Sequence, residues 1–409
     1  MSHKTKVLFR NLAPKLKKVI ADKHSILLLG PRQTGKTTLV KEFLLSEQKN
    51  VFEYSLIDPG IRLAFETDPQ RLIREIEEAD YPLVFIDEIQ KVPQLLDAVQ
   101  YLIDNKKAYF ILTGSSARKL RRKGTNLLAG RVLSFYLAPF TWNEIGVEPK
   151  NYFGLNPTLE KLNKVDVSLE EQLVFGSLPP VVLAEKKYRE LFLKTYAQVY
   201  LEEEIRQEAL VRKIGAFGRF LELSALESGT APNFSRLSQH SGVSLPAIRE
   251  FFQILEDTLI VRRLDPYLKS PRKRLFSRPK YYYFDTGVRN ALAKLPLNAD
   301  LLKTQRGILF EHFVILELFR RSSLPEANFR LYWWRTLEGA EVDCVIEKDD
   351  GSLIPLEIKA STSISFGQLK GLVSFLRTHS QAKTGYVVSL IERPQKLKEN
   401  IIALPWWLI

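Results

Sequence analysis

Residues 30–37 read GPRQTGKT and match the pattern G-x-x-x-x-G-K-[ST] completely. The apolar run SILLLG at 25–30 leads into this loop, and the helical pattern TTLVKEFLL follows it. A strand, a glycine-containing turn and a helix in this order form a phosphate-binding loop, because backbone amides and the helix N-terminus face the anion. The stretch therefore predicts a nucleotide-binding α/β domain.

The residues of this loop have distinct expected roles in binding the nucleotide. We expect Lys36 to reach the β- and γ-phosphates and Thr37 to hold Mg²⁺. The complete set of expected nucleotide contacts is Gly30, Pro31, Arg32, Gln33, Thr34, Gly35, Lys36, Thr37, Thr38, Thr113 and Arg131.

Two further apolar runs, LVFID at 83–87 and AYFILTG at 108–114, read as strands of the same parallel sheet. The first places Asp87 at a strand end, near the expected Mg²⁺, and Glu88 next to it to orient or deprotonate the attacking water. The second places Thr113, with Ser115 as the alternative, where it can sense the γ-phosphate. Together these positions predict hydrolysis of the nucleotide as well as binding.

An arginine that stabilises the developing charge is a further expected part of this site. Arg131, in LAGRV, is the first candidate, and Arg118 is the competing one. A structural ion pair is the alternative role of Arg131. An arginine acting in trans would require a homo-oligomer, so the oligomeric state stays open.

Length and charge set the context for these motifs. The chain has 409 residues, which suggests two to four domains, and 60 Lys+Arg against 47 Asp+Glu give a net charge of +13. Such a surplus favours a polyanionic partner such as DNA, although a solvated basic surface is the plain alternative. The single cysteine, Cys344, excludes a disulfide scaffold and a Cys-rich zinc site. No signal segment and no apolar run of about 18 residues is present, so we expect a cytoplasmic protein without a membrane partner.

In order along the chain, GPRQTGKTT, LVFIDEIQKVP, FILTGSSA, LAGRV and FGSLPPVV resemble prokaryotic ATPases of the AAA+ superfamily that carry a C-terminal DUF4143 region. The ATPase motifs are specific, and FGSLPPVV is a looser match. The expected architecture is an α/β multidomain protein with four parts. These are a P-loop AAA+ parallel-sheet core at 1–140, a helical lid at 141–212, a winged-helix DNA-binding module at 213–288 and a second α/β domain at 289–409.

The expected winged-helix module begins with two helices around a tight turn at 241–243, with Leu237, Val243, Ile248 and Leu255 as its core. Its second helix carries Arg249, which is placed to enter a DNA groove. A basic turn follows, and its expected phosphate contacts are Lys269, Arg272, Lys273, Arg274, Arg278 and Lys280. The alternative is a module that serves only as a spacer or a protein contact.

The last domain has a second constellation of charged residues. Two expected strands, joined by a hairpin loop at 347–352, carry Asp343 on the first and Glu357 and Lys359 on the second. Side chains alternate along a strand, so Glu357 and Lys359 share a face, and Asp343 can lie opposite them. Two carboxylates and a lysine then converge at one point.

This arrangement resembles the D-x(n)-E-x-K signature of PD-(D/E)xK nucleases, which have a restriction-endonuclease-like fold. The resemblance implies that Asp343, Glu357 and the Ile358 carbonyl bind one or two Mg²⁺ ions, for which Mn²⁺ can substitute, and that Lys359 positions or activates water. Glu311, on the preceding helix, fits an additional acidic ligand. Glu341 is an alternative or second ligand, because it faces the same side as Asp343.

The sequence thus predicts an ATP-hydrolysing, DNA-binding protein with a metal-dependent endonuclease domain. Branched DNA, such as a Holliday junction in repair or recombination, and foreign DNA in defence are both open as substrates. The alternative is a nucleotide-driven switch or DNA-binding regulator whose nuclease-like domain is inactive.

Overall fold

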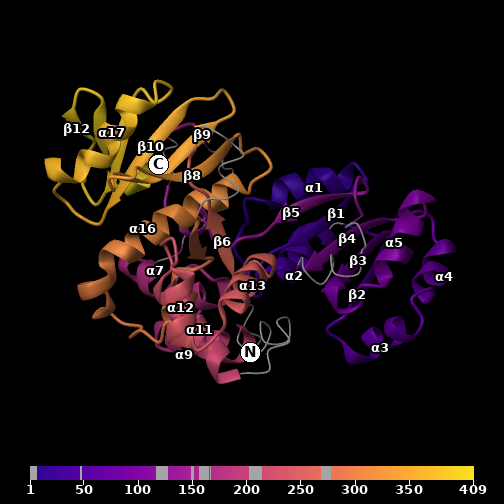
Figure 1. Cartoon of the computed structure of the whole chain (residues 1–409). Coiled ribbons are helices and arrows are strands. Elements are labelled where there is room, and N and C mark those ends of the chain that lie inside the picture. Colours follow the sequence, from indigo (N-terminus) through magenta and orange to yellow (C-terminus); the bar gives the residue numbers. More distant parts are fainter. Residues whose placement is uncertain are drawn as a thin grey trace. The chain divides into compact units, whose positions relative to one another are not determined.

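The computed structural model of the chain (Figure 1) describes residues 7–46, 48–116, 128–148, 152–155, 165, 167–201, 214–268 and 278–409. The chain divides into two compact units. Unit 1 comprises Met1–Ala138 with Asp257–Ile260, and unit 2 comprises Pro139–Glu256 with Val261–Ile409.

Unit 1 is built on a five-stranded sheet with the order β2-β3-β4-β1-β5, and every pairing in it is parallel. Its strands are β1 (Ser25–Leu29), β2 (Val51–Ser55), β3 (Leu83–Asp87), β4 (Tyr109–Gly114) and β5 (Val132–Tyr136). The three strands predicted from apolar runs are therefore confirmed within one residue. β2 and β5 were not predicted, because they lie at the sheet edges and their residues are only partly buried or exposed.

Helices cover both faces of this sheet, and strand alternation decides which side chain meets which layer. One face is covered by α1 (Ala13–Ala21), α2 (Lys36–Leu39) and the π-helical η1 (Val40–Leu45). The other face is covered by α3 (Pro59–Thr67), α4 (Arg71–Glu77) and α5 (Leu95–Asp104), with the short η2 (Ile89–Lys91) after β3. Ile26 and Leu28 of β1 pack in the core under the first set of helices, whereas Leu27 packs under the second set.

The first half of unit 2 is mostly helical, and it includes the described part of the segment 141–212 that was expected to form a helical lid. Its elements are η3 (Asn143–Ile145), α7 (Leu169–Phe175), α8 (Pro179–Val182), α9 (Lys186–Thr195), the π-helical η4 (Tyr196–Leu201), α11 (Ile214–Leu226), α12 (Phe234–Ser241), α13 (Leu245–Asp257) and α15 (Thr286–Leu292).

The helix-turn-helix expected around residue 242 is present as α12 and α13. Gly242 ends α12 at φ 72°, a left-handed conformation that favours glycine, and the expected core residues Leu237, Val243, Ile248 and Leu255 are all buried. An antiparallel pair follows, formed by β6 (Val261–Leu264) and β7 (Lys280–Tyr283). The turn at 269–277 between these strands lies outside the described residues.

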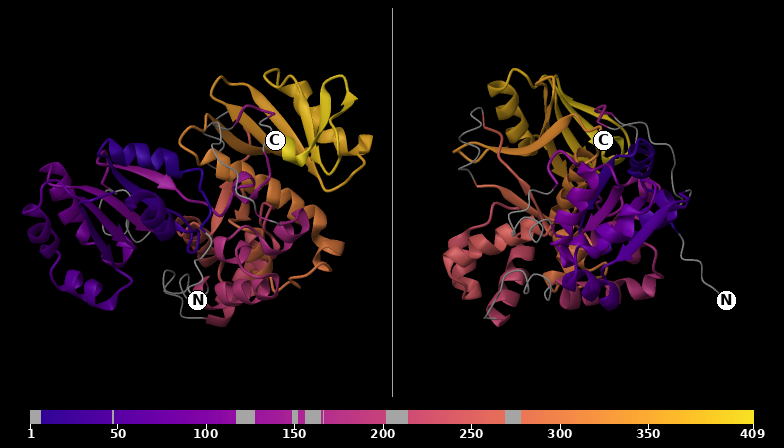
Figure 2. Two further views of the ribbon diagram at one scale, coloured as in Figure 1. Left: turned by 180° about the vertical axis from the view of Figure 1, so that it is seen from behind. Right: turned by 90° about the vertical axis from the view of Figure 1, so that its right-hand side faces the viewer.

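The second half of unit 2 contains a six-stranded mixed sheet with the order β12-β13-β11-β10-β9-β8. Its strands are β8 (Phe329–Arg335), β9 (Glu341–Lys348), β10 (Leu353–Lys359), β11 (Gly385–Ser389), β12 (Gln395–Lys398) and β13 (Ile401–Pro405). The long helix α16 (Leu301–Ser322) packs on one face, and α17 (Lys370–Thr378), preceded by η5 (Phe366–Leu369), packs on the other (Figures 1 and 2). The short η6 (Trp406–Leu408) follows β13 near the C-terminus.

The FGSLPPVV motif forms the junction between α7 and α8, and a buried carboxylate explains its glycine. Gly176 has φ 74°, and a Cβ there would lie 2.0 Å from Asp285 Oδ1. The next residue, Ser177, donates its backbone N–H to Asp285 Oδ2 at 2.7 Å. Only glycine allows the carboxylate of Asp285, which caps α15 by accepting from Val288 N, to approach this closely.

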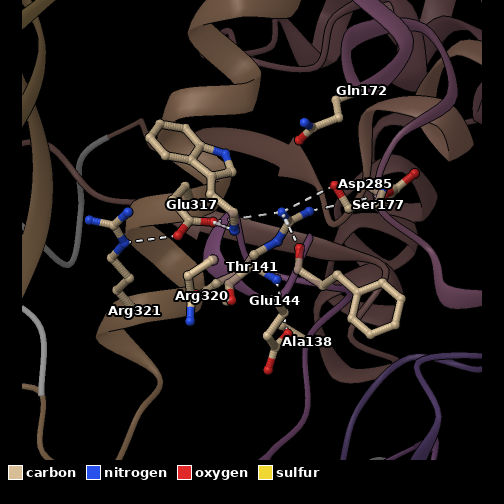
Figure 3. Close-up of polar contacts among 12 residues, drawn as sticks. Ala138, Thr141, Glu144, Gln172, Ser177, Asp285, Glu317, Arg320 and Arg321 are labelled. Carbon is tan, nitrogen blue, oxygen red and sulfur yellow. Dashed lines mark hydrogen bonds and ion pairs between the residues drawn. The ribbon is translucent and has the colours of Figure 1, made fainter. Parts of the chain in front are cut away.

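α16 extends the same buried network (Figure 3). Arg320 donates from Nη1 to the Phe140 carbonyl at 2.8 Å and lies 3.4 Å from Ser177 Oγ. One turn earlier, Glu317 accepts the backbone N–H of Trp142 at 3.1 Å and pairs with Arg321 at 2.8 Å. These contacts fix residues 139–146 and the α7–α8 junction against α16, so we assign this motif a structural role.

Candidate functional site

The loop at residues 30–37 has the compact geometry that its sequence predicts. Gly35, at φ 90°, directly precedes α2. A Cβ on Gly30 would lie 2.3 Å from the Leu137 carbonyl oxygen, so this position requires glycine. Lys36 is 4% exposed, and its Nζ donates to the carbonyls of Gly30 at 2.9 Å and Pro31 at 3.0 Å. The lysine ammonium therefore lies along the inner side of the loop.

The side chains predicted to hold Mg²⁺ are brought together from three elements. Thr37 Oγ1, on α2, lies 3.0 Å from both carboxylate oxygens of Asp87 at the end of β3. Thr113, on β4, donates from Oγ1 to Asp87 Oδ1 at 2.5 Å. Burial raises the pKa of Asp87 above its usual value, against the opposing effect of these hydroxyl groups. A hydroxyl and a carboxylate are oxygen ligands of the kind that Mg²⁺ prefers, so this donor set fits the ion.

Glu88 follows Asp87 in a left-handed conformation at φ 60°, which is uncommon for a residue with a Cβ. Its backbone N–H donates to Thr113 Oγ1 at 3.0 Å. Its carboxylate oxygen Oε2 accepts from Ser115 Oγ at 3.2 Å and from Gln90 Nε2. The general-base candidate is thus held by two polar side chains, and its partner Gln90 was not predicted from the sequence.

Arg10 is a second residue of this region that sequence reasoning missed. It is 5% exposed, and its guanidinium donates to the Thr34 carbonyl and to the Ala138 carbonyl, each at 2.6 Å. Arg10 therefore braces the phosphate-binding loop from the N-terminal segment. An arginine 20 residues before the loop has no sequence signal of its own, because only the tertiary fold places it there.

Other residues predicted to contact the nucleotide differ in their exposure and partners. Gln33 and Thr38 are exposed on the loop and on α2, and Arg32 is partly exposed. Arg131 pairs with Asp104 through two hydrogen bonds of 2.6 and 2.9 Å, which is the structural ion pair that the alternative predicts. The competing candidate, Arg118, lies outside the described residues.

In unit 2, Asp343, Glu357 and Lys359 converge as the strand pattern predicts. β9 and β10 are antiparallel neighbours. Lys359 Nζ lies 3.4 Å from Asp343 Oδ2 and 2.6 Å from Glu357 Oε1. The backbone N–H of Ile358 donates to Asp343 Oδ2 at 2.8 Å. Asp343 and Glu357 are each only 7% exposed.

The carboxylates of this cluster lie close enough together to shift one another's pKa. Burial, then the neighbouring Asp343 carboxylate, raises the pKa of Glu357 to about 8. The same two causes raise the pKa of Glu311 to about 7. Burial alone would lower the pKa of Lys359, but the carboxylates of Asp343 and Glu357 outweigh it and raise that pKa.

Glu311, on α16, lies next to Lys280, and this corrects the prediction for the lysine. Lys280 was expected to contact DNA phosphates from an exposed wing. It is instead 5% exposed, with its Nζ 2.6 Å from Glu341 and 3.7 Å from Glu311. The reason is strand alternation: Lys280 and Tyr282 of β7 share a face, and Tyr282 donates from its hydroxyl to Glu311 Oε1 at 2.9 Å. Glu341, the alternative ligand, is thus engaged by Lys280.

The implied metal can be tested against the donors that are present. Within the described ranges, no group of three or more His, Cys, Asp and Glu side chains has an arrangement that could hold a metal ion. A site built from Asp343, Glu357 and the Ile358 carbonyl therefore needs water to complete its coordination, as Mg²⁺ commonly does. Glu357 Oε2 is buried and has no hydrogen-bond partner among the described residues. A buried carboxylate oxygen without a partner fits a cation ligand.

The expected DNA surface is only partly described. Arg249 on α13 and Arg278 before β7 are exposed. The other predicted wing contacts, Lys269, Arg272, Lys273 and Arg274, lie outside the described residues, as does the basic cluster at 118–123.

Three family models match successive parts of the chain. Residues 22–146 match an AAA domain, residues 166–299 match a domain of unknown function (DUF8612), and residues 306–409 match a second domain of unknown function (DUF4143). The first match covers the parallel sheet and the phosphate-binding loop. Residues 22–146, which fold into the parallel sheet with its phosphate-binding loop, are therefore similar to AAA domains, and residues 306–409 are similar to DUF4143 domains.

Two relatives match over nearly the whole chain, and a third matches over half of it. The uncharacterized proteins Rv2008c of Mycobacterium tuberculosis and Mb2031c of Mycobacterium bovis are each 27% identical over 402 residues, covering 97% of this chain and 83% of theirs. The uncharacterized protein MJ1637 of Methanocaldococcus jannaschii is 29% identical over 223 residues, covering 50% of this chain and 40% of its own.

Among solved structures, the Walker-type ATPase paby2304 of Pyrococcus abyssi aligns with a TM-score of 0.47 and 15% identity, covering 71% of this chain and 97% of that one. In the part of the chain that the structure describes, no helix has the length and apolar character needed to cross a membrane.

Proposed function

We propose that unit 1 binds ATP and hydrolyses it. The supporting observation is the direct contact of Thr37 with Asp87, next to a Glu88 held by Ser115 and Gln90. In this proposal Lys36 and the loop amides bind the phosphates, and Glu88 orients or deprotonates the attacking water. Mg²⁺, held by Thr37 and Asp87, would neutralise charge on the phosphates.

We further propose that the DUF4143 region cuts DNA with the help of Mg²⁺ or Mn²⁺. The observation that carries this is the convergence of Asp343, Glu357 and Lys359, in which Glu357 Oε2 is buried and has no partner in the described chain. Asp343, Glu357 and the Ile358 carbonyl would hold the ion, which would polarise the scissile phosphate. Lys359 would position water and offset the charge that develops on the phosphate.

DNA is the partner that joins the two activities. The net charge of +13 and the exposed Arg249 and Arg278 support a DNA-binding surface. ATP hydrolysis would remodel the protein or load it on DNA, and the C-terminal site would then cut. The two proposed classes of substrate are branched DNA, as in repair or recombination, and foreign DNA.

The test of the DNA-cutting proposal is a cleavage assay with the full chain. Labelled linear, flapped and four-way DNA are incubated with Mg²⁺ or Mn²⁺, using the wild-type protein, Asp343→Ala and Lys359→Ala. Cutting of at least one substrate by the wild type, lost in both variants, supports the proposal. Absence of cutting on every substrate while DNA binding persists would exclude it.

The alternative is a DNA-binding regulator whose nuclease-like domain is inactive, and one observation favours it. Lys359 and Lys280 already pair with carboxylates of this cluster, so two cationic side chains stand beside the oxygens that a metal ion would use. This alternative predicts ATP hydrolysis and salt-dependent DNA binding without any cleavage.

A further inference from the structure

The acidic cluster of unit 2 consists of two carboxylate pairs, each with its own lysine. Asp343 and Glu357 share Lys359, and Glu311 and Glu341 share Lys280. The two lysines come from different strands: Lys359 lies on β10 beside the D-x(n)-E-x-K carboxylates, whereas Lys280 lies on β7, well before them in the chain. The sequence motif therefore accounts for only one of the two lysines.

We propose that Lys280 is a built-in counter-cation for Glu311 and Glu341, and that it limits this site to one divalent cation, held by Asp343 and Glu357. The inference rests on the proposed metal-dependent function and deepens it. It assigns Glu311 and Glu341 to binding Lys280, so that neither is a direct ligand of a second ion.

The geometry fixes Lys280 between its two carboxylates. Its ammonium lies 2.6 Å from Glu341 and 3.7 Å from Glu311, and it stands 5.2 Å from the centre of the Trp333 ring. Its backbone is held because β7 pairs with β6. An ammonium ion in this position excludes a divalent cation by repulsion and by occupying the same oxygen atoms. Burial alone would lower the pKa of Lys280, but the neighbouring carboxylates outweigh it and raise that pKa, so the ammonium is charged at neutral pH.

The side chain of Lys359 can move aside for a cation more easily than that of Lys280. The side chain of Lys359 is 27% exposed, whereas that of Lys280 is 7% exposed and lies over an indole. In addition, Glu357 offers a buried oxygen that has no partner in the described chain, whereas Glu311 Oε1 already accepts from Tyr282. A cation can therefore enter between Asp343 and Glu357, whereas Oε1 of Glu311 and Oε1 of Glu341 already contact the Lys280 ammonium.

The test counts the Mn²⁺ ions bound by the full chain without nucleotide, by electron paramagnetic resonance and titration calorimetry. The Asp343→Ala variant is the reference, because subtracting its bound Mn²⁺ removes any ion held at the nucleotide site. We expect the wild type to bind one Asp343-dependent Mn²⁺ and the Lys280→Met variant to bind a second one. Lys280→Arg, which keeps the positive charge, should bind one ion like the wild type.

Two ions in the wild type, or a folded Lys280→Met that still binds only one with unchanged affinity, would overturn the inference and leave the metal-dependent function standing. No Asp343-dependent Mn²⁺ in the wild type would overturn both. If Lys280→Met does not fold, Glu341→Gln decides. Unchanged Mn²⁺ affinity in Glu341→Gln supports the assignment, and an affinity lower by about tenfold or more shows that Glu341 is a ligand, which overturns it.

Discussion

Lys36 is the single residue on which ATP hydrolysis should depend most. Its ammonium lies along the phosphate-binding loop, and no other described side chain takes that position. We expect Lys36→Ala to reduce the rate of ATP hydrolysis by about a hundredfold or more, because a preorganised positive charge on the phosphates is lost. Lys41→Ala is the control, since Lys41 is half exposed and pairs with Glu53. Hydrolysis that survives in Lys36→Ala would show that this loop is not the ATP site.

Arg10 should act on ATP binding through the loop without touching the nucleotide. Its buried guanidinium donates to the carbonyl of Thr34, and a hydrogen bond from a charged group contributes about 1.5–3 kcal/mol. We expect Arg10→Met to raise the KM for ATP by about tenfold with a smaller effect on kcat, and Arg10→Lys to restore part of it. Arg62→Met, at a partly exposed position on α3 where the arginine lies 3.9 Å from Glu66, should leave the KM unchanged. Equal KM values in the two methionine variants would contradict this role.

The close contact of α17 with β9 should contribute to the stability of the C-terminal domain. A Cβ on Gly371 of α17 would lie 1.7 Å from the Glu341 carbonyl oxygen, whereas a Cβ on Gly307 of α16 would meet nothing within 4 Å. Gly371→Ala should lower the free energy of unfolding by about 1–3 kcal/mol, because the helix must move away from the strand. Gly307→Ala should be neutral or stabilising by up to about 1 kcal/mol. Urea unfolding of both variants checks this, and equal midpoints would refute the close contact.

The elements themselves show what the sequence can and cannot predict. β1, β3, β4, α16 and the hairpin strands β9 and β10 were predicted from the sequence, because each buries a continuous face. The edge strands β2 and β5 were missed, because their residues are only partly buried. Asp343, Glu357 and Lys359 were found because the motif and a hairpin bring them together. Lys280 was misplaced because basic residues near a turn look exposed, and only packing against Glu311 and Glu341 shows otherwise.

At the level of the whole molecule, the net charge of +13 predicts that affinity for DNA falls as the salt concentration rises. Each phosphate contact releases counterions, so the logarithm of DNA affinity should fall with the logarithm of salt concentration by about 0.9 per contact. Arg249→Ala should reduce this slope by about 1 if Arg249 contacts a phosphate. Arg74→Ala, which removes a partner of Asp68 in unit 1, is the matched control. DNA affinity that does not change with salt would contradict phosphate contacts altogether.

We propose that the C-terminal cluster cuts DNA through its carboxylates and a divalent cation. The most direct measurement compares Mg²⁺-started cleavage of four-way DNA by the wild type and by Glu357→Gln, with DNA binding measured in the same samples. Glutamine keeps the size of the side chain and removes the charge that holds the ion. We expect the wild type to cleave the DNA and Glu357→Gln to cleave it at least about a hundredfold more slowly, with equal DNA binding. Equal cleavage rates, or binding without cleavage in both proteins, would contradict it.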